Sequence, residues 1–535
     1  MPTVKDVTFD LLRQLGLTTV VGNPGSTEQP FLKDFPPDFD YVMALQEASV
    51  VSIADGLSQG LRKPVLVSLH TGAGTGNAMC AILTAFVNKT PLIITAGQQH
   101  RNMLLTEPML TNIDATLLPR PYVKWAYEPA RPQDIPAAFM RAYATAVQQP
   151  AGPVYLSLPL DDWDQPIDAI DVARTIATRI GPDPARVAEF ASRIDAARAP
   201  VLIYGGDIAR AGAEAWADGV ALAERLGAPV FAPPFCERTP FPETHPQFSG
   251  ALPPAIGPLS RQLAGHDLVV VIGAPVFRYY PYVAGAYLPE GASLLHVTDD
   301  PNASAKAVVG DSLVSDAGLF LKALAPLVKA RTAFTGTPRR KPPQLPADEL
   351  PLTPAAVYAT LNALLPEDFV LAQETPSNMP QLQDQIRVRK PDVSYTLCSG
   401  ALGWTTPAAV GLALAEQKCA RNRPVLCIMG DGSFQYSIQG VYTGVQRKAH
   451  LIYVVLQNEQ YGILKQFAEL ENTPNVPGLD LPGLDIVSLG KGYGARASKA
   501  ETREDLADAF KAALDFKGTS VIVVPISRDL GPLVG

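Results

Sequence analysis

Gly430-Asp431-Gly432-Ser433 directly follows the apolar run 424–429, and a second apolar run, 451–456, leads into Gln457-Asn458. We expect both runs to be buried strands, so that a carboxylate and an amide follow two strand ends. Gly432 permits a tight turn, and Ser433 is expected to open a helix whose N–H groups face outward. A hard divalent cation and a diphosphate together require oxygen ligands and a helix N-terminus. The pattern therefore predicts a site for both, although an ordinary strand–turn–helix with an Asp cap is the alternative.

Length, charge and cysteine content exclude several other classes of protein. The 535 residues suffice for about three domains. A net charge of −8 without any long basic stretch argues against nucleic-acid binding. No apolar run reaches the roughly 18 residues of a membrane span, and residues 1–6 lack the apolar core of a signal peptide. The five cysteines show no Cys-x-x-Cys spacing, which favours free thiols and a cytoplasmic location without membrane contact.

Apolar runs alternate with helical periods along the chain, which predicts α/β domains whose parallel sheets are covered by helices. We expect three doubly wound domains, at residues 1–165, 185–330 and 352–535. The polar stretch 165–184 is expected to connect the first two. The stretch 331–351 is expected to be a linker, because it contains prolines and the basic run 339–341. The expected strands are 18–22, 41–45, 65–69, 92–96, 154–158, 268–272, 294–297, 369–372, 425–429, 451–456 and 521–524; the expected helices include 48–59, 78–87 and one near Thr353.

Glu47 is the first candidate outside the 430–458 segment. It follows the apolar run 41–45, where a helix is expected to begin. A carboxylate at such a position is often a helix cap that complements the helix dipole, and Glu47 on its own permits that interpretation. Beside a cation and diphosphate site, however, a role in binding the same ligand becomes the stronger hypothesis.

His70 stands between the apolar run 65–69 and the glycine-rich stretch 71–77, which we expect to be a turn. Open α/β sheets place ligands at the carboxyl ends of their strands, so His70 is a candidate functional residue, with a surface or capping histidine as the alternative. The spacing Gly72-x-Gly74-x-Gly76 is not the dinucleotide fingerprint, and no fitting acidic residue follows. NAD binding is therefore not expected.

The segment 430–458 resembles the binding motif of thiamine-diphosphate (ThDP) enzymes, with Gln457 in place of the first of two asparagines. Nearly the whole chain further resembles the benzoylformate decarboxylase family. This implies a pyrimidine-binding domain (1–165), a middle domain (185–330) and a diphosphate-binding domain (352–535). The runs that carry the resemblance are 22–26, 30–36, 45–48, 74–79, 91–99, 118–121, 123–125, 265–267, 271–279, 475–480 and 491–494.

The resemblance implies roles for individual residues. Ser26 would bind the substrate carboxylate, Glu47 would activate a cofactor held by another subunit, and His70 would transfer protons. Asp431, Asn458 and the carbonyl of Gln460 would hold Mg²⁺, with Ca²⁺ as an alternative cation. The implied cofactor-binding residues are Thr375, Ser377, Gly400, Leu402, Gly430, Gly432, Ser433, Tyr436, Tyr461 and Gly462; the implied substrate-pocket residues are Thr396, Ile463, Leu464 and Phe467, whose alternative is plain packing.

Two positions depart from the family pattern. Tyr280 stands where the family places a second catalytic histidine, and a phenol is a poor proton acceptor at neutral pH. Thr396 replaces an aromatic residue of the pocket. Both departures affect proton handling and the acceptance of a phenyl substrate, and we include Tyr280 among the candidate catalytic residues.

The implied activity is non-oxidative, ThDP- and Mg²⁺-dependent decarboxylation of a 2-keto acid, aromatic or similar, to an aldehyde and CO₂. A carboligase or lyase acting on 2-hydroxy ketones, aldehydes or 2-hydroxyacyl-CoA is the first alternative. A non-catalytic subunit of the same fold is the second, and the intact Glu47, Asp431 and Asn458 argue against it. The resemblance also implies a homodimer at least, and commonly a homotetramer.

Overall fold

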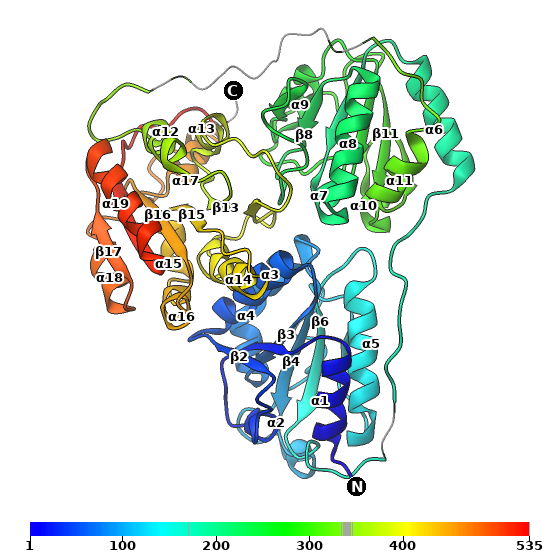
Figure 1. The fold of residues 1–535 in the computed structure, drawn as a ribbon, viewed down its shortest axis with the longest axis vertical. Coiled ribbons are helices and arrows are strands. Elements are labelled where there is room, and N and C mark those ends of the chain that lie inside the picture. The colour runs from blue at the N-terminus through cyan, green and yellow to red at the C-terminus, as the bar shows by residue number, and fades with distance from the viewer. Residues whose placement is uncertain (169–170, 333, 335–343, 345, 534–535) are drawn as a thin grey trace.

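The computed structural model describes residues 1–168, 171–332, 334, 344 and 346–533. They form three α/β units, each built on a six-stranded sheet (Figure 1). All strand pairs within these sheets are parallel, as the alternation of apolar runs and helices predicts. Much of the predicted linker, residues 333, 335–343 and 345, lies outside the described residues. Within the described part, no helix has the length and apolar character needed to cross a membrane.

The first unit contains a sheet with the strand order β2-β1-β3-β4-β6-β5. Its central strands are completely buried, because helices cover both faces, whereas the edge strand β2 is half-buried. The elements are α1 (Val4–Gln14), β1 (Thr19–Gly22), α2 (Gln29–Leu32), β2 (Asp40–Met43), α3 (Glu47–Leu61), β3 (Val65–Leu69), α4 (Thr71–Val87), β4 (Leu92–Gln98), η1 (Arg101–Thr106), β5 (Ala126–Tyr127), η2 (Pro132–Asp134), α5 (Ile135–Val147) and β6 (Val154–Pro159).

The middle unit has the strand order β12-β11-β10-β7-β8-β9 and its own apolar core. The segment that leads into it, 171–183, has no helix or strand, as predicted for a connection. The elements are α6 (Pro184–Ala196), β7 (Pro200–Tyr204), α7 (Gly206–Ala211), α8 (Ala213–Leu226), β8 (Val230–Ala232), β9 (Phe248–Ala251), α9 (Ile256–Gln262), β10 (Leu268–Ile272), β11 (Ser293–Thr298), α10 (Pro301–Lys306), β12 (Asp311–Val314) and α11 (Ala317–Leu324).

The third unit repeats the plan of the first, with the strand order β14-β13-β15-β16-β18-β17. It begins with a helix capped by Thr353, as expected. The elements are α12 (Pro354–Leu364), β13 (Val370–Glu374), α13 (Met379–Gln385), β14 (Ser394–Thr396), α14 (Thr405–Lys418), β15 (Val425–Gly430), α15 (Asp431–Tyr436), α16 (Gly440–Gln446), β16 (Leu451–Gln457), α17 (Gly462–Leu470), α18 (Ile486–Gly492), β17 (Arg496–Lys499), α19 (Arg503–Phe516) and β18 (Thr519–Pro525).

Helices α3 and α14 join the first and third units along one continuous core (Figure 1). Nearly every residue of both helices is buried, including the polar ones, so the two helices are covered on every side. Glycines bring the two backbones into contact: a Cβ at Gly56 would lie 2.0 Å from the carbonyl oxygen of Ala408. The indole of Trp404 donates a hydrogen bond of 2.7 Å to the buried Asp55. This packing fixes the two units relative to each other.

A buried ion cluster ties the middle unit to the first. The Lys89 ammonium lies 2.7 Å from Asp207 and 2.5 Å from Asp299. Burial disfavours the charged form of Lys89, but the two carboxylates together raise its pKa. In the same cluster Arg210 pairs with Glu237 at 2.6 Å. Lys89 thus anchors the first unit at the carboxyl ends of the middle sheet.

Two local expectations are wrong. The glycine-rich stretch 71–77 is not a turn but the beginning of α4. Two of its glycines serve close packing instead: a Cβ at Gly74 would lie 3.1 Å from Cγ of Glu47, and one at Gly72 would lie 3.1 Å from Oδ1 of Asn112. Ser433 does not open its helix, because α15 already begins at Asp431.

Candidate functional site

Asp431 and Asn458 meet at the carboxyl edge of the third sheet. They follow the neighbouring parallel strands β15 and β16, in which Gly430 stands opposite Leu456. The Asp431 carboxylate accepts hydrogen bonds from the backbone N–H groups of Gly432 at 2.8 Å and Glu459 at 2.7 Å. Asp431 and Asn458 therefore lie close together in the structure, as their spacing in the sequence predicts.

The chemistry of this loop fits a divalent cation. Burial raises the pKa of Asp431, so a cation beside it would favour the carboxylate form. Oδ1 of Asn458 lies 3.2 Å from the backbone nitrogen of Gln460, which folds the loop back on itself, and Gln460 pairs with Asp480 in an isolated bridge. No cluster of three His, Cys, Asp or Glu suited to a metal occurs within the described residues. The donor set that the family resemblance implies is instead one carboxylate, one amide and one backbone carbonyl, a set of hard oxygens.

Ser377, one of the predicted diphosphate residues, lies beside the same loop. A Cβ at Gly462 would lie 3.0 Å from Oγ of Ser377 and 3.3 Å from Nδ2 of Asn458, so these groups line one cradle that requires a glycine. A Cβ at Gly432 would lie 2.7 Å from the ring of Tyr461. Of the remaining predicted residues, Thr375 and Ser433 are buried, Leu402 is half-buried, and Tyr436 and Gly400 are exposed.

Glu47 is not the cap of its helix. Gln46 caps α3, accepting hydrogen bonds from the backbone N–H groups of Ala48 and Ser49. The Glu47 carboxylate instead accepts one hydrogen bond from Nδ2 of Asn23 and one from Nδ2 of Asn77, each of 3.1 Å. The Glu47 carboxylate therefore makes no capping hydrogen bond, although the residue lies in the first turn of α3, where its charge complements the helix dipole.

His70 likewise makes no capping hydrogen bond at the start of α4. Its Nδ1 lies 2.9 Å from Oε2 of Glu28 and 3.2 Å from Oγ1 of Thr27. The backbone there is so close that a Cβ at Gly25 would lie 2.0 Å from Nδ1. Ser26 is exposed in the same loop. Ser26 and His70 therefore lie near each other, at the carboxyl ends of adjacent strands β1 and β3.

Tyr280 contacts the predicted substrate pocket. Its ring lies 4.7 Å from the ring of Phe467, centroid to centroid, although Tyr280 belongs to the middle unit and Phe467 to α17. Tyr280 is 62% exposed in the single chain, and Leu464 is also exposed, while Ile463 is half-buried. Thr396 ends β14 and donates a hydrogen bond of 2.8 Å to the carbonyl of Gln373.

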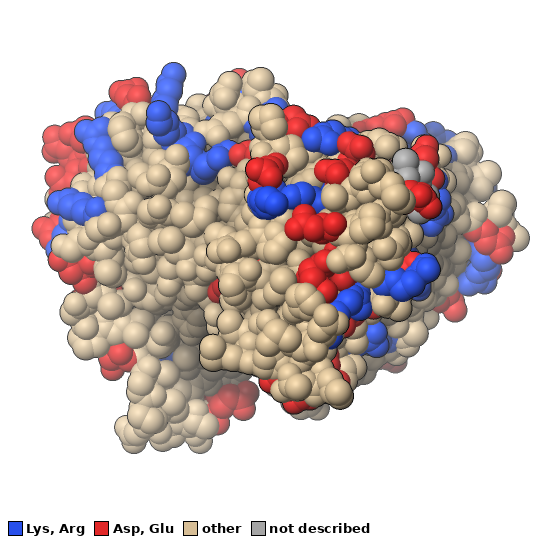
Figure 2. Space-filling model, turned by 90° about the horizontal axis from the view of Figure 1, so that it is seen from below, with Lys and Arg blue, Asp and Glu red and all other residues tan. Residues whose placement is uncertain are grey.

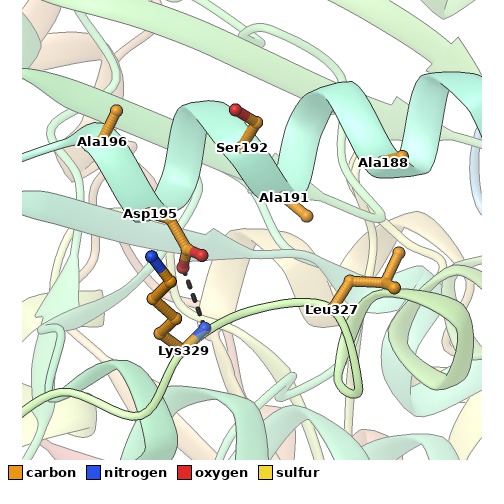
Figure 3. Close-up of a pocket in the computed structure, with 7 residues that line it drawn as sticks. All are labelled: Ala188, Ala191, Ser192, Asp195, Ala196, Leu327 and Lys329. Atoms are coloured by element: carbon orange, nitrogen blue, oxygen red, sulfur yellow. Dashed lines mark hydrogen bonds between the residues drawn. The ribbon is translucent and has the colours of Figure 1, made fainter.

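The candidate residues of the first and third units are not linked by polar contacts in the part of the chain that the structure describes. Among the described residues, no hydrogen bond or ion pair joins Glu47 to Asp431, Asn458 or Gln460. A groove of about 470 Å³ lies elsewhere, on the middle unit between α6 and the segment after α11 (Figure 3). It contains none of the candidate residues; it is lined by Ala188, Ala191, Ser192, Asp195, Ala196, Leu327 and Lys329.

Three polar residues of this geometry have no sequence prediction. Asn23 and Asn77 hold Glu47, and Glu28 contacts His70. Asn23 and Asn77 stand inside the runs 22–26 and 74–79, so their positions draw attention to them. The sequence does not show that their two amides converge on one carboxylate, because this depends on how β1 and α4 pack.

Comparisons with known proteins agree with this geometry. The family model "Thiamine pyrophosphate enzyme, N-terminal TPP binding domain" matches residues 2–117, the central-domain model of the same enzymes matches 187–324, and their "C-terminal TPP binding domain" matches 380–524. Thiamine pyrophosphate is another name for ThDP. The three matches fall on the three α/β units.

Individual relatives cover the whole chain. Benzoylformate decarboxylase of Pseudomonas aeruginosa is 44% identical over 98% of this chain and 99% of the relative. The crystal structure of benzoylformate decarboxylase from Polynucleobacter necessarius is 65% identical, with a TM-score of 0.98 over 99% of this chain and 100% of that one. The 4-hydroxybenzoylformate decarboxylase of Rhodococcus jostii RHA1 is 40% identical, with a TM-score of 0.95 over 99% and 100%. The chain therefore belongs to the benzoylformate decarboxylase family of ThDP-dependent 2-keto acid decarboxylases.

Proposed function

We propose that this enzyme decarboxylates a benzoylformate-like 2-keto acid to the corresponding aldehyde and CO₂. Its cofactors are ThDP and a divalent cation, typically Mg²⁺. The observation that carries the proposal is Glu47, a buried carboxylate oriented by two amides at a strand end. A structural role would not require that arrangement. A cofactor-binding role requires a carboxylate held in one place, as a hydrogen-bond acceptor for the pyrimidine ring of the cofactor.

The residues of the third unit would hold the cofactor. Asp431, Asn458 and the carbonyl of Gln460 supply the oxygens for the cation, and Ser377 stands beside them for the diphosphate. Thr375, Ser433 and Tyr436 are further diphosphate candidates. When bound, ThDP supplies an electron sink for the pair of electrons left when CO₂ departs.

The residues of the first unit would handle the substrate and its protons. Ser26 is exposed beside His70 and can donate its hydroxyl to a carboxylate. His70 is suited to proton transfer, because one nitrogen of a neutral imidazole donates a proton and the other accepts one. Positioned acid–base groups contribute about 10²–10⁴-fold to rate, so the loss of His70 should be clearly measurable.

Carboligation is a second candidate activity, and Tyr280 is the observation that favours it. Tyr280 covers Phe467 with a phenol ring at the position where the family has a second catalytic histidine. A phenol is a poorer proton donor and acceptor than imidazole at neutral pH. Slower protonation leaves more time for a second aldehyde to react, which yields a hydroxy ketone.

The active site is proposed to form between two copies of this chain. The elements around Glu47 and His70 expose apolar side chains, and the segment 103–118 exposes more, with Leu105 at 96% and Met109 at 87%. Clusters of exposed apolar residues mark interaction surfaces. Figure 2 shows broad areas without charged side chains, with Lys, Arg, Asp and Glu interspersed around them. This surface would be covered in a homodimer, and two such dimers would form a tetramer. We also propose a cytoplasmic location.

Product analysis across aromatic and aliphatic 2-keto acids tests the activity. With ThDP and Mg²⁺ present, we expect CO₂ and aldehyde in equal amounts from benzoylformate and 4-hydroxybenzoylformate. Asp431→Ala serves as the matched control, since it removes one cation ligand and should weaken cofactor binding. Cofactor binding without turnover of any keto acid would contradict the proposal and favour a non-catalytic subunit.

A further inference from the structure

Glu28 is a buried carboxylate to which neither the sequence nor the family resemblance assigns a role. It lies 5% exposed at the start of α2, behind His70. Its two oxygens together face four hydrogen-bond partners. Oε1 accepts from Oγ1 of Thr27 at 2.7 Å and from the backbone N–H of Gly97 at 2.9 Å. Oε2 accepts from the backbone N–H of Gly25 at 3.0 Å and lies 2.9 Å from Nδ1 of His70.

The donors around Glu28 settle which nitrogen of His70 carries the proton. Two of the four partners are backbone N–H groups and can only donate. With the Thr27 hydroxyl also donating, the carboxylate is an acceptor at every contact, so Nδ1 of His70 must donate to it. The second neighbour of Nδ1 is the Thr27 oxygen at 3.2 Å. Its own proton points to Glu28, so this oxygen too offers Nδ1 only a lone pair.

The backbone is shaped around this arrangement. A Cβ at Gly97 would lie 2.1 Å from Oε1 of Glu28, and a Cβ at Gly25 would lie 2.0 Å from Nδ1 of His70. Both positions therefore require glycine so that the carboxylate and the imidazole can approach the chain. Side chains held between backbone groups in this way have little freedom to rotate.

We propose that Glu28 is a positioning residue that keeps the proton of neutral His70 on Nδ1 and so makes Nε2 the proton-transfer atom. The inference rests on the proposed role of His70 in catalysis. A proton taken up from the substrate forms the imidazolium at Nε2, while the Nδ1 proton stays between the ring and Glu28. The same Nε2 proton is returned in the donating step, so His70 ends neutral and Glu28 stays ionised throughout.

Glu28→Gln tests this arrangement with nearly the same shape. The amide has one oxygen and one NH₂ group, so it can take two orientations. In the first, the NH₂ group faces the Gly97 N–H and Thr27. In the second, it faces the Gly25 N–H and His70. In the second orientation Nδ1 becomes an acceptor and the neutral ring carries its proton on Nε2. Glu28→Asp keeps the charge on a shorter side chain. Thr27→Val is a milder second variant, because it removes the hydroxyl that contacts both Glu28 and His70.

The primary readout is the tautomer of His70, measured by ¹⁵N NMR on the full chain with ThDP and Mg²⁺ after histidine labelling. The chain has six histidines, and His70→Asn identifies the resonance in question. We expect a protonated Nδ1 and an unprotonated Nε2 in the parent, and a shift toward the opposite pattern in Glu28→Gln. Glu224→Gln is the matched control, since Glu224 lies 3.2 Å from Nε2 of His245 on the middle unit. It should leave the His70 signals unchanged.

Kinetics supply the second readout. In Glu28→Gln we expect kcat to fall by about 10- to 100-fold, which is less than the full contribution of up to about 10⁴-fold from a positioned acid–base group. KM should change little, and Glu28→Asp should recover part of the rate. The control Glu224→Gln should retain the activity of the parent.

The outcomes separate this inference from the proposed function. If neutral His70 in the parent carries its proton on Nε2, or if Glu28→Gln keeps both the Nδ1–H form and the kcat of the parent, the role of Glu28 is refuted. If Glu28→Gln does not fold, the parent spectrum and Thr27→Val still decide the matter: a parent with the Nδ1–H form and a smaller shift in Thr27→Val supports the proposal. Full activity in His70→Asn would refute the catalytic role of His70 instead, whatever its tautomer.

Discussion

At the scale of single residues, the site depends on side chains that orient other side chains. Asn23 and Asn77 hold Glu47, and Glu28 holds His70. Glu47 and His70 are the two oriented groups, and both would act in the proposed reaction. Binding energy and rate both depend on such preorganised groups, because a misplaced acid or base loses most of its effect. Tyr280 stands where the family resemblance implies a second histidine, and it offers the sharpest test at this scale.

We expect Tyr280→His to accelerate aldehyde release and to lower the share of hydroxy-ketone product when aldehyde is supplied. Imidazole can donate and accept a proton near neutral pH, whereas a phenol cannot do so readily. The measurement is the rate of benzoylformate consumption together with the ratio of the two products, at equal cofactor saturation. Tyr280→Phe is the matched control, because it keeps the contact with Phe467 and removes only the hydroxyl. If the histidine variant changes neither the rate nor the ratio, position 280 has no part in proton transfer.

At the scale of secondary-structure elements, the packing of α3 against α14 fixes the first unit relative to the third. Gly411→Ala should destabilise the protein by about 1–3 kcal/mol, the usual cost of overpacking. The added Cβ would lie 2.0 Å from the carbonyl oxygen of Ile53 and 2.5 Å from the backbone nitrogen of Leu57, and neither backbone can move aside cheaply. Gly492→Ala is the control, since nothing lies within 4 Å of its Cβ. Equal midpoints of thermal unfolding in the two variants would contradict tight packing at this joint.

Strand β11 contains a buried histidine that should make stability depend on pH. Burial lowers the pKa of His296, which is hydrogen-bonded to Ser312 at 2.9 Å and to the carbonyl of Ala274 at 2.8 Å. The unfolded chain therefore binds a proton more readily than the folded one. Stability is fully present above the ordinary histidine pKa of about 6.5 and is lost as the pH falls below it, by at most about 1.4 kcal/mol per pH unit.

His296→Gln should flatten that dependence, because a glutamine can donate and accept the same hydrogen bonds but does not titrate. The measurement is the midpoint of thermal unfolding between pH 7.5 and about 5, the range around the ordinary histidine pKa. His100→Gln is the control, because the His100 side chain is 40% exposed. An unchanged pH slope in His296→Gln, or an equal change in the control, would show that other groups set the dependence.

The sequence predicts these elements unevenly, for physical reasons. Long buried strands such as β3 and β10 are predicted at their observed bounds, because continuous apolar runs have few other stable arrangements. The two-residue strand β5 is too short to leave a pattern. The glycines of the stretch 71–77 predict a turn. In the structure, Gly72 instead leaves room for the side chain of Asn112, which is distant in the sequence. The spacing of two strand ends makes Asp431 and Asn458 candidates, and the position after an apolar run makes Glu47 one. Glu28 becomes a candidate only through the tertiary contacts around it.

At the scale of the whole molecule, we propose that the single chain holds two half-sites. Glu47 and His70 lie on the first unit, and Asp431 and Asn458 on the third, and no hydrogen bond or ion pair of the described residues joins the two sets. The exposed apolar segment 103–118 and the rigid α3–α14 joint together suggest how the halves are completed. A second copy would present its first unit to the third unit of this one, and each chain would contribute to both sites of the dimer.

The test of this arrangement is complementation between two inactive chains. Glu47→Gln should abolish turnover while the cofactor still binds, because Asp431 and Asn458 remain. Asp431→Ala should abolish it through loss of the cation. Co-expressed with different affinity tags and purified through both, the two chains form hybrid dimers. One site in each hybrid then combines the intact Glu47 of one chain with the intact Asp431 of the other, while the second site has neither. Activity should therefore return in the hybrid fraction and be absent from dimers of either variant alone. Hybrids as inactive as the variants, or a monomeric fraction of the parent with full activity, would show that one chain builds the whole site itself.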